Sequence, residues 1–302
     1  MADRIGRAIG GGVTDDALPH DGPFDRQLRR LRRDRAAVQG GADAFLFRHM
    51  ADELLARLNL VTRPFADALD LGCAGGQLSA ALRKRGLAVT SADAGRLFAQ
   101  AGVQCDEDRL PFAPASFDLV VSAGALDTVN DLPGALIQIR RALRPDGLFL
   151  GAFVGAGSLP RLRSALRAAE AAQGLPAGAR LHPQIDVRAA GDLLGRAGFA
   201  LPVADEESLT VRYSRFDRLI EDLRAMAGAN LLHARARQGF GRTGLAAAIA
   251  DFSASADADG KVPEQFRIVH VAGWAPGPDQ PRPAARGSGS VSLADALKSP
   301  RP

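Results

Sequence analysis

The feature that most constrains the fold of this chain is a series of short apolar segments, separated by helical patterns, between residues 65 and 154. The predicted strands span residues 65–72, 87–92, 103–105, 117–122 and 148–154, and the helices between them span 77–85, 96–101 and 132–143. Strands that alternate with helices at this pace indicate βαβ units. The expected fold class is therefore α/β, built on a parallel sheet.

Two further helical patterns precede the predicted sheet, over residues 24–35 and 44–60, and Pro64 ends the second. The first contains six arginines, and the i, i+3 spacing of Leu28 and Leu31 suits a helix with one narrow apolar edge. In the second half we expect helices over 158–173, 187–197 and 216–226, an extended pair within 199–214 and a closing strand over 266–274.

The expected organisation is one main domain over residues 65–275, with a helical lid before it over residues 24–64. Residues 1–23 are glycine-rich with scattered aspartate and proline, and we expect a disordered leader there. Residues 276–302 are rich in proline, glycine and serine, which predicts a loosely packed tail.

Composition excludes several classes of protein. Only three of the 38 basic residues are lysine and the net charge is +4, so an arginine-biased proteome explains the basic content and nucleic-acid binding is not implied. Two cysteines, Cys73 and Cys105, are too few for a disulfide framework or a multi-cysteine zinc site. No apolar run reaches membrane-spanning length, and the first residues have no secretory apolar core. A cytoplasmic protein is expected.

A glycine-rich turn after the first strand predicts a nucleotide-like ligand. Asp70, Gly72 and Gly76 form a D-x-G-x-x-x-G pattern that opens a helix, where backbone N–H groups can approach a ligand closely. The pattern lacks the strict G-x-G-x-x-G of dinucleotide sites. A carboxylate at Asp70 suits a cationic ligand better than a pyrophosphate, which favours S-adenosylmethionine over NAD.

Further acidic residues close the next two strands. Asp93 is placed to accept hydrogen bonds from ribose hydroxyls, and Asp106 and Glu107 to accept from the adenine amino group. Ala74 in the turn and Ser122 at the end of the fourth strand complete the candidate cofactor-binding set. Any one acid alone is more often a solvated loop residue or a helix N-cap, but three at successive strand ends favour a site.

The segments DLGCAGGQL, CDEDRLPF, FDLVVS and LRPDGLFL resemble class I S-adenosylmethionine-dependent methyltransferases. PFDRQLRRLRRDRAA, SFDLVVSAGALDTVNDLPGALIQIRRALRPDGLF, DLLGRAGFALPVADEESLTVRYSRFDRLIEDLRAM and RPAARGSGSVS are similar to one subfamily, the mitochondrial complex I assembly factors described as arginine hydroxylases and their alphaproteobacterial relatives. This resemblance covers about residues 23–298. A more distant resemblance is to the malonyl-carrier-protein methyltransferase of biotin synthesis.

The resemblance implies a Rossmann-like seven-stranded sheet with flanking helices, S-adenosylmethionine as cofactor, and a protein substrate in the respiratory NADH dehydrogenase. Three departures stand out. Ala74 replaces a usual glycine, and its methyl group crowds the cofactor tail unless φ is negative. Only 12 residues separate Asp93 from Asp106, which shortens the wall of the adenine pocket. Asp127 and Thr128 stand where relatives carry a His-Trp pair.

Three functions stay open at this point. The first is a methyltransferase for a protein or carrier-bound substrate, with Asp127 as the substrate-facing group. The second is arginine hydroxylation, and the third is an assembly factor without turnover. No His-x-Asp or His-x-Glu motif predicts an iron site, and no metal is expected.

Several residues have both a structural and a functional interpretation. His182 is a solvent-facing loop residue or reaches the cleft above the strands, and Tyr213 packs in the core or lines a pocket. His270 and the two cysteines are expected to be packed core residues. The arginines of residues 26–35 bind an acidic partner or a lipid surface, or simply form an exposed helix face.

Overall fold

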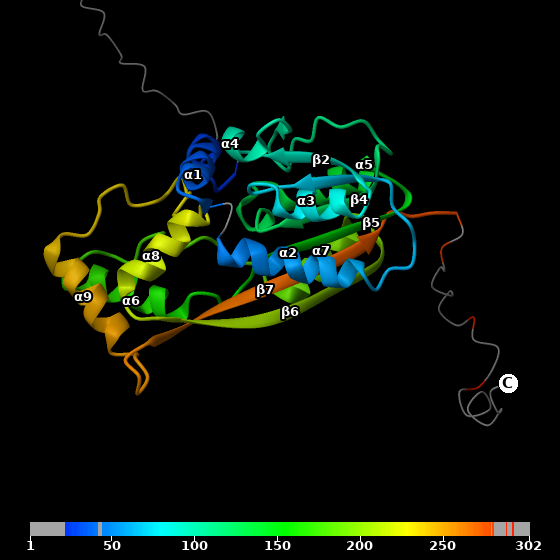
Figure 1. Ribbon diagram of the computed structural model, residues 1–302. Helices are drawn as coiled ribbons and strands as arrows, with labels where there is room; N and C mark the ends of the chain where they lie inside the picture. Colours follow the sequence, from blue (N-terminus) through cyan, green and yellow to red (C-terminus); the bar gives the residue numbers. More distant parts are fainter. Residues whose placement is uncertain (1–21, 42–43, 279, 281–287, 289–291, 293–302) are drawn as a thin grey trace, which may run out of the picture.

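A computed structural model of the protein describes residues 22–41, 44–278, 280, 288 and 292, and centres on a seven-stranded sheet (Figure 1). The strand order is β3-β2-β1-β4-β5-β7-β6. The strands are β1 (Asp67–Leu71), β2 (Ala88–Asp93), β3 (Val103–Gln104), β4 (Phe117–Ala123), β5 (Leu143–Val154), β6 (Ala200–Tyr213) and β7 (Val262–Trp274). Strands β1 to β5 pair in parallel, while β7 is antiparallel to both β5 and β6. The predicted α/β, Rossmann-like sheet is confirmed.

The described helices agree with most of the predicted ones to within a few residues. They are α1 (Arg26–Val38), α2 (Phe45–Leu58), α3 (Gln77–Lys84), α4 (Arg96–Ala99), α5 (Leu132–Ala142), α6 (Pro160–Ala172), α7 (Val187–Arg196), α8 (Phe216–Ala225) and α9 (Arg242–Ser253). Helix α9 was not expected from the sequence, and a short 3-10 turn, η2 (Leu126–Thr128), follows β4. None of the described helices is long and apolar enough to cross a membrane.

Alternate residues of the strands enter two separate apolar clusters, one on each face of the sheet. Leu119 and Val121 of β4 face the cluster that includes α2 and α3, whereas Val120 faces the cluster that includes α5 and α7. Burial of both faces is typical of parallel strands, whose sequences are nearly continuous apolar runs. The carboxyl ends of β1 and β2 meet at one edge, where Asp70 lies opposite Ser91.

Strands β6 and β7 continue past the end of β5 as a two-stranded ribbon, which Figure 1 shows reaching the region of α6, α8 and α9. The expected extended pair within residues 199–214 is wrong, because these residues form one strand that pairs with β7. Pro202 lies within β6, which is at the edge of the sheet, and the register shifts between Ala200 and Val203. An edge strand with an irregularity tolerates proline.

Helix α1 lies beside α4 at the edge of the sheet (Figure 1). The predicted apolar edge holds only for Leu28, which packs against Phe24, Leu231 and Leu232; Leu31 is 45% exposed, while Arg29 and Arg33 are each only 3% exposed. The helix therefore turns an arginine face inward. Its start is fixed by Asp25, whose carboxylate accepts a hydrogen bond from the N–H of Leu28 at 2.9 Å.

Most residues of the two predicted terminal segments lie outside the described part of the chain. Of the expected leader, only Gly22 and Pro23 are described, and both are exposed. Of the expected tail, residues 276–278, 280, 288 and 292 are described. The single-domain interpretation of residues 65–275 stays a prediction.

Candidate functional site

The glycine-rich turn leads from β1 into α3 through four residues of positive φ, Gly72, Ala74, Gly75 and Gly76. Gly72 has φ +77°, and a Cβ there would lie 2.3 Å from the Cβ of Ala125, so only glycine fits. Gly76, with φ +87°, is the N-cap of α3. Ala74 has φ +40° and is buried, so its methyl group sits in a conformation that favours glycine, and the case of negative φ does not apply.

Asp70 lies at the end of β1 in an almost fully buried position, 1% exposed. Its carboxylate accepts a hydrogen bond from the Ser79 hydroxyl at 2.6 Å, and that hydroxyl also contacts Ser91 Oγ at 2.8 Å. Burial raises the pKa of Asp70 to about 6, although the hydrogen bond from Ser79 lowers it. A buried, weakly stabilised carboxylate of this kind suits a cationic partner.

The acids predicted at the next two strand ends form one buried cluster with Asp108, which the sequence interpretation missed. Each is less than a tenth exposed. Four arginines of α1 contact them. The shortest contacts are Arg26 to Asp108 at 2.6 Å, Arg29 to Glu107 at 2.7 Å, Arg30 to Asp106 at 2.5 Å and Arg33 to Asp93 at 2.6 Å, and Asp106 also lies within 4.0 Å of Arg26 and Arg29. The structure therefore brings the predicted acids together and adds a cationic partner from the same chain.

The arginine contacts answer the question that the sequence left open about residues 26–35. Positions 26, 29, 30 and 33 have the i, i+3, i+4, i+7 spacing of one helix face, and this spacing was the available signal. Their partners are internal acids, so the interpretation as a wholly exposed helix face is wrong for them. Arg35, on another face, is exposed.

The residues around the turn and the strand ends fit S-adenosylmethionine by chemistry. Carboxylates follow β1, β2 and β3, and two buried polar atoms, Asp106 Oδ1 and Ser122 Oγ, have no hydrogen-bond partner among the described residues. The space beside the turn is small in this structure. The cavity lined by Asp70, Gly72 and Ala74, under Phe47 of α2, has a volume of about 20 Å³.

The connection between Asp93 and Asp106 contains only the short α4, as expected, and a larger hollow lies beside it at the edge of the sheet. It has a volume of about 690 Å³ and adjoins the glycine-rich turn at Cys73, Gly75 and Gly76. Its other walls include residues of β2, α3 and α4.

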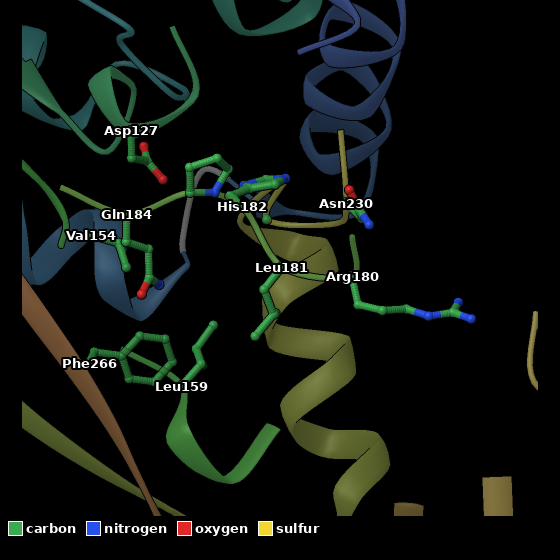
Figure 2. Close-up of a pocket in the computed structure, with 11 residues that line it drawn as sticks. Asp127, Val154, Leu159, Arg180, Leu181, His182, Gln184, Asn230 and Phe266 are labelled. Atoms are coloured by element: carbon green, nitrogen blue, oxygen red, sulfur yellow. The ribbon is translucent and has the colours of Figure 1, made fainter. Parts of the chain in front are cut away.

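A second cavity, of about 70 Å³, lies between η2, the connection before α7 and the segment after α8. Figure 2 shows Asp127 pointing toward this space from η2, with Val154, Leu159 and Phe266 as apolar walls. The pKa of the Asp127 carboxyl is raised, chiefly by burial. No ion pair or side-chain hydrogen bond joins Asp127 to another residue within the described ranges.

His182 also lines this cavity, so the interpretation as a solvent-facing residue is wrong. Its Nε2 accepts a hydrogen bond from the N–H of Leu231 at 2.9 Å, and its ring meets Phe24 edge-on at 5.3 Å. Burial lowers the pKa of His182 to about 4. The imidazole is therefore neutral at neutral pH and acts as an acceptor.

The remaining singled-out residues are packed. Cys73, Cys105, Tyr213 and His270 are all buried, as core residues are. Burial raises the pKa of Cys105 to about 12 and that of Cys73 still further, so neither thiol is activated as a nucleophile. Within the described ranges, no group of three or more His, Cys, Asp or Glu side chains is arranged to hold a metal ion.

Comparison with known proteins gives the same class of fold. Residues 69–151 match the methyltransferase domain family. A putative methyltransferase from Bacillus halodurans C-125 has a TM-score of 0.50 and 15% sequence identity, over 74% of this chain and 99% of that chain. The fold and the match together define a class I methyltransferase domain, a class whose cofactor is S-adenosylmethionine.

Longer relatives narrow the class. The chain is 36% identical over 287 residues to the mitochondrial arginine hydroxylase NDUFAF5 of Homo sapiens, covering 91% of this chain and 83% of that protein. It is 35% identical over 269 residues to the malonyl-[acyl-carrier protein] O-methyltransferase of Methylovorus sp. (strain MP688), covering 82% and 88%. The chain belongs to the methyltransferase-fold family that contains the NDUFAF5 arginine hydroxylases.

Proposed function

We propose that the protein is an S-adenosylmethionine-dependent methyltransferase acting on a protein side chain or a carrier-bound group. The observation that carries this proposal is the position of Asp127, a carboxylate without an ion-pair partner among the described residues, at the cavity that follows β4. Strands β1 and β2 end at the same edge of the sheet, and their buried acids, Asp70 and Asp93, lie there. A cofactor site and an acceptor site at one edge would place the two reactants together.

In this proposal the cofactor supplies an electrophilic methyl group, and the chain supplies alignment and exclusion of water. Asp70 holds the cationic end, Asp93 accepts from the ribose hydroxyls, and Asp106 with Glu107 accepts from the adenine edge. Gly72, Ala74 and Gly76 supply the close backbone approach, and Ser122 a hydroxyl at the end of β4.

The acceptor group enters the cavity of Asp127. The carboxylate orients a guanidinium or amine by a charge-assisted hydrogen bond, and the apolar walls of Leu159 and Phe266 contact its methylene stem. In the in-line attack the acceptor nitrogen bonds to the methyl carbon as the carbon–sulfur bond breaks and S-adenosylhomocysteine leaves, and the proton that the nitrogen gives up passes to the Asp127 carboxylate.

A second candidate is supported by the 91% of this chain that aligns with NDUFAF5, which is named an arginine hydroxylase. In that case the chain modifies an arginine of a respiratory NADH dehydrogenase subunit, or assists its assembly without turnover. Both versions place the protein in the bacterial cytoplasm, with peripheral contact at the inner membrane.

Mass spectrometry of the acceptor tests the proposal. Protein subunits from the host are incubated with the enzyme and S-adenosylmethionine carrying a deuterated methyl group, with the Asp127→Asn variant as control. A deuterated methyl on one side chain supports methyl transfer. Addition of a single oxygen atom instead supports hydroxylation, and no mass change with a folded, cofactor-binding protein supports the assembly role.

A further inference from the structure

The arginine face of α1 occupies the acids to which the proposed function assigns the cofactor. Arg33 donates from Nε and Nη2 to the two carboxylate oxygens of Asp93, each at 2.6 Å. Arg29 donates in the same forked way to Glu107, at 2.7 and 3.0 Å. Bidentate pairs of this kind are the strongest form of carboxylate recognition by arginine.

Asp93 has no acceptor capacity left for a ribose in this arrangement. Besides the two bonds from Arg33, its oxygens accept from the N–H of Gly95 at 2.8 Å and of Ala74 at 3.2 Å. Four donors match the four lone-pair positions of a carboxylate. The ribose hydroxyls and Arg33 therefore compete for the same atoms.

The space for the cofactor beside Asp70 is also restricted. The cavity of about 20 Å³ beside Asp70 and Gly72 has room for about one water molecule. Phe47 of α2 forms one of its walls. The methionine part of the cofactor is too large for this cavity, and the larger hollow of about 690 Å³ on the turn is not lined by Asp70 or Gly72.

The contact between α1 and the end of β2 is close enough to depend on a glycine. A Cβ at Gly95 would lie 2.7 Å from the Cβ of Arg33. Arg33 also lies over the Phe98 ring, with its guanidinium carbon 5.3 Å from the ring centroid. Arg29 reaches further, to Thr128 Oγ1 at 3.0 Å and the carbonyl of Ala125 at 3.2 Å. The helix is thus seated on the cofactor acids and on the edge of the acceptor region.

We propose that α1 is an autoinhibitory plug, whose arginines act as an internal substitute for the cofactor and must leave the acids before S-adenosylmethionine binds. The inference rests on the cofactor site of the proposed function. The two ligands are alike in one respect, because the cofactor also brings hydrogen-bond donors, the ribose hydroxyls and the adenine amino group, to these carboxylates. The apparent affinity for S-adenosylmethionine is the intrinsic affinity multiplied by the fraction of molecules in which α1 is undocked.

Equilibrium binding of S-adenosylmethionine to the full chain tests the plug, using calorimetry on wild type, Arg33→Gln, Gly95→Ala and the control Arg35→Gln. Arg33→Gln removes the fork on Asp93, and Gly95→Ala pushes α1 away without changing any charge. Both are expected to tighten binding by about tenfold or more, because the docked fraction falls. Arg35→Gln lies on the exposed face and is expected to bind like wild type.

Hydrogen exchange supplies a readout that does not depend on affinity. Adding the cofactor to wild type is expected to increase exchange over residues 26–38, the reverse of the protection that a bound ligand usually gives. Equal affinity in wild type and Gly95→Ala, or cofactor-induced protection of α1 with weaker binding by Arg33→Gln, would overturn the plug and keep the cofactor site. If all four proteins are folded and none binds, the proposed function fails together with the plug.

Discussion

Arg33 and Asp93 are separated by 60 residues in the chain, yet two hydrogen bonds of 2.6 Å join them in a buried position. The pair connects α1 to the carboxyl end of β2. Each partner depends on the other, because an isolated charge in such a position is costly to desolvate. Stability, cofactor access and the orientation of α1 are therefore linked through the same set of ion pairs.

The contribution of the buried ion pairs to stability can be measured at the pair Arg29–Glu107. Glu107→Gln leaves a buried guanidinium without its counter-charge, and we expect the free energy of unfolding to fall by about 3–5 kcal/mol. Urea denaturation checks this. The control is Glu221→Gln, which removes one partner of an exposed pair with Arg218 and should cost less than about 1 kcal/mol. Equal, small losses in both variants would contradict the buried cluster.

We expect replacement of Ala74 by glycine to stabilise the protein. Its φ of +40° is a left-handed conformation that costs a residue with a Cβ roughly 1–2 kcal/mol. Ala74→Gly removes this strain and loses about 0.4–1 kcal/mol through the unfolded chain, so the net gain is about 0.5–1 kcal/mol. Thermal unfolding measures it. The same change at the exposed helical position Ala80 should destabilise by roughly 0.5–1 kcal/mol, and destabilisation by Ala74→Gly would show that the turn is unstrained.

We expect a substitution at Asp127 to affect modification of the acceptor without affecting cofactor binding. Asp127→Asn removes the charge that orients the acceptor, and a charge-assisted hydrogen bond of about 1.5–3 kcal/mol corresponds to a loss of about 10- to 100-fold in acceptor modification. Cofactor affinity should stay unchanged. The control is Asp131→Asn, which keeps the N-cap of α5 and lies outside the cavity. Full activity of Asp127→Asn would exclude the carboxylate from the acceptor site.

His182 predicts a pH dependence of stability. Burial lowers its pKa from 6.5 to about 4, so the folded protein holds the neutral form, which accepts the Leu231 hydrogen bond. Its contribution to stability is complete above the unfolded value of about 6.5 and is lost as the pH falls toward about 4, since the unfolded chain binds the proton first. Wild type should therefore lose more stability than His182→Gln on acidification through this range.

Comparing wild type with His182→Gln separates the contribution of His182 from those of other titrating groups. Asp70 has the opposite sign, because its raised pKa makes the folded state the stronger proton binder between about 4 and 6, but both proteins share it. Parallel stability curves for wild type and His182→Gln would contradict the assigned protonation state.

The sheet and its strand-end acids were predictable because each depends on short local patterns. Asp70 and Asp93 lie at the ends of short strand-like runs, and the glycine turn between them is specified by its own residues. Helix α9 was missed because RTGLAAAIADFS is rich in alanine and has little amphipathic contrast, so helical periodicity is weak. The pairing of β6 along its whole length with β7 depends on tertiary structure, because only its position at the sheet edge makes Pro202 acceptable within a strand.

The plug could not be predicted from the same patterns. An arginine face is normally solvated, and the apolar pair Leu28 and Leu31 suggested the opposite orientation for α1. Only the long-range meeting of residues 26–33 with residues 93–108 makes the arginines the inward face. Asp108 was overlooked for the same reason: its role comes from Arg26, which lies far away in sequence.

The most direct measurement is a calorimetric titration of the full chain with S-adenosylmethionine, in parallel with Asp93→Ala. The account predicts that wild type binds the cofactor with a stoichiometry of about one, and that Asp93→Ala loses at least about tenfold in affinity even though it also frees Arg33. Binding by Asp93→Ala as tight as that of wild type would contradict the assignment of the ribose to Asp93. A folded wild type and a folded Gly95→Ala that both fail to bind would contradict the cofactor site itself.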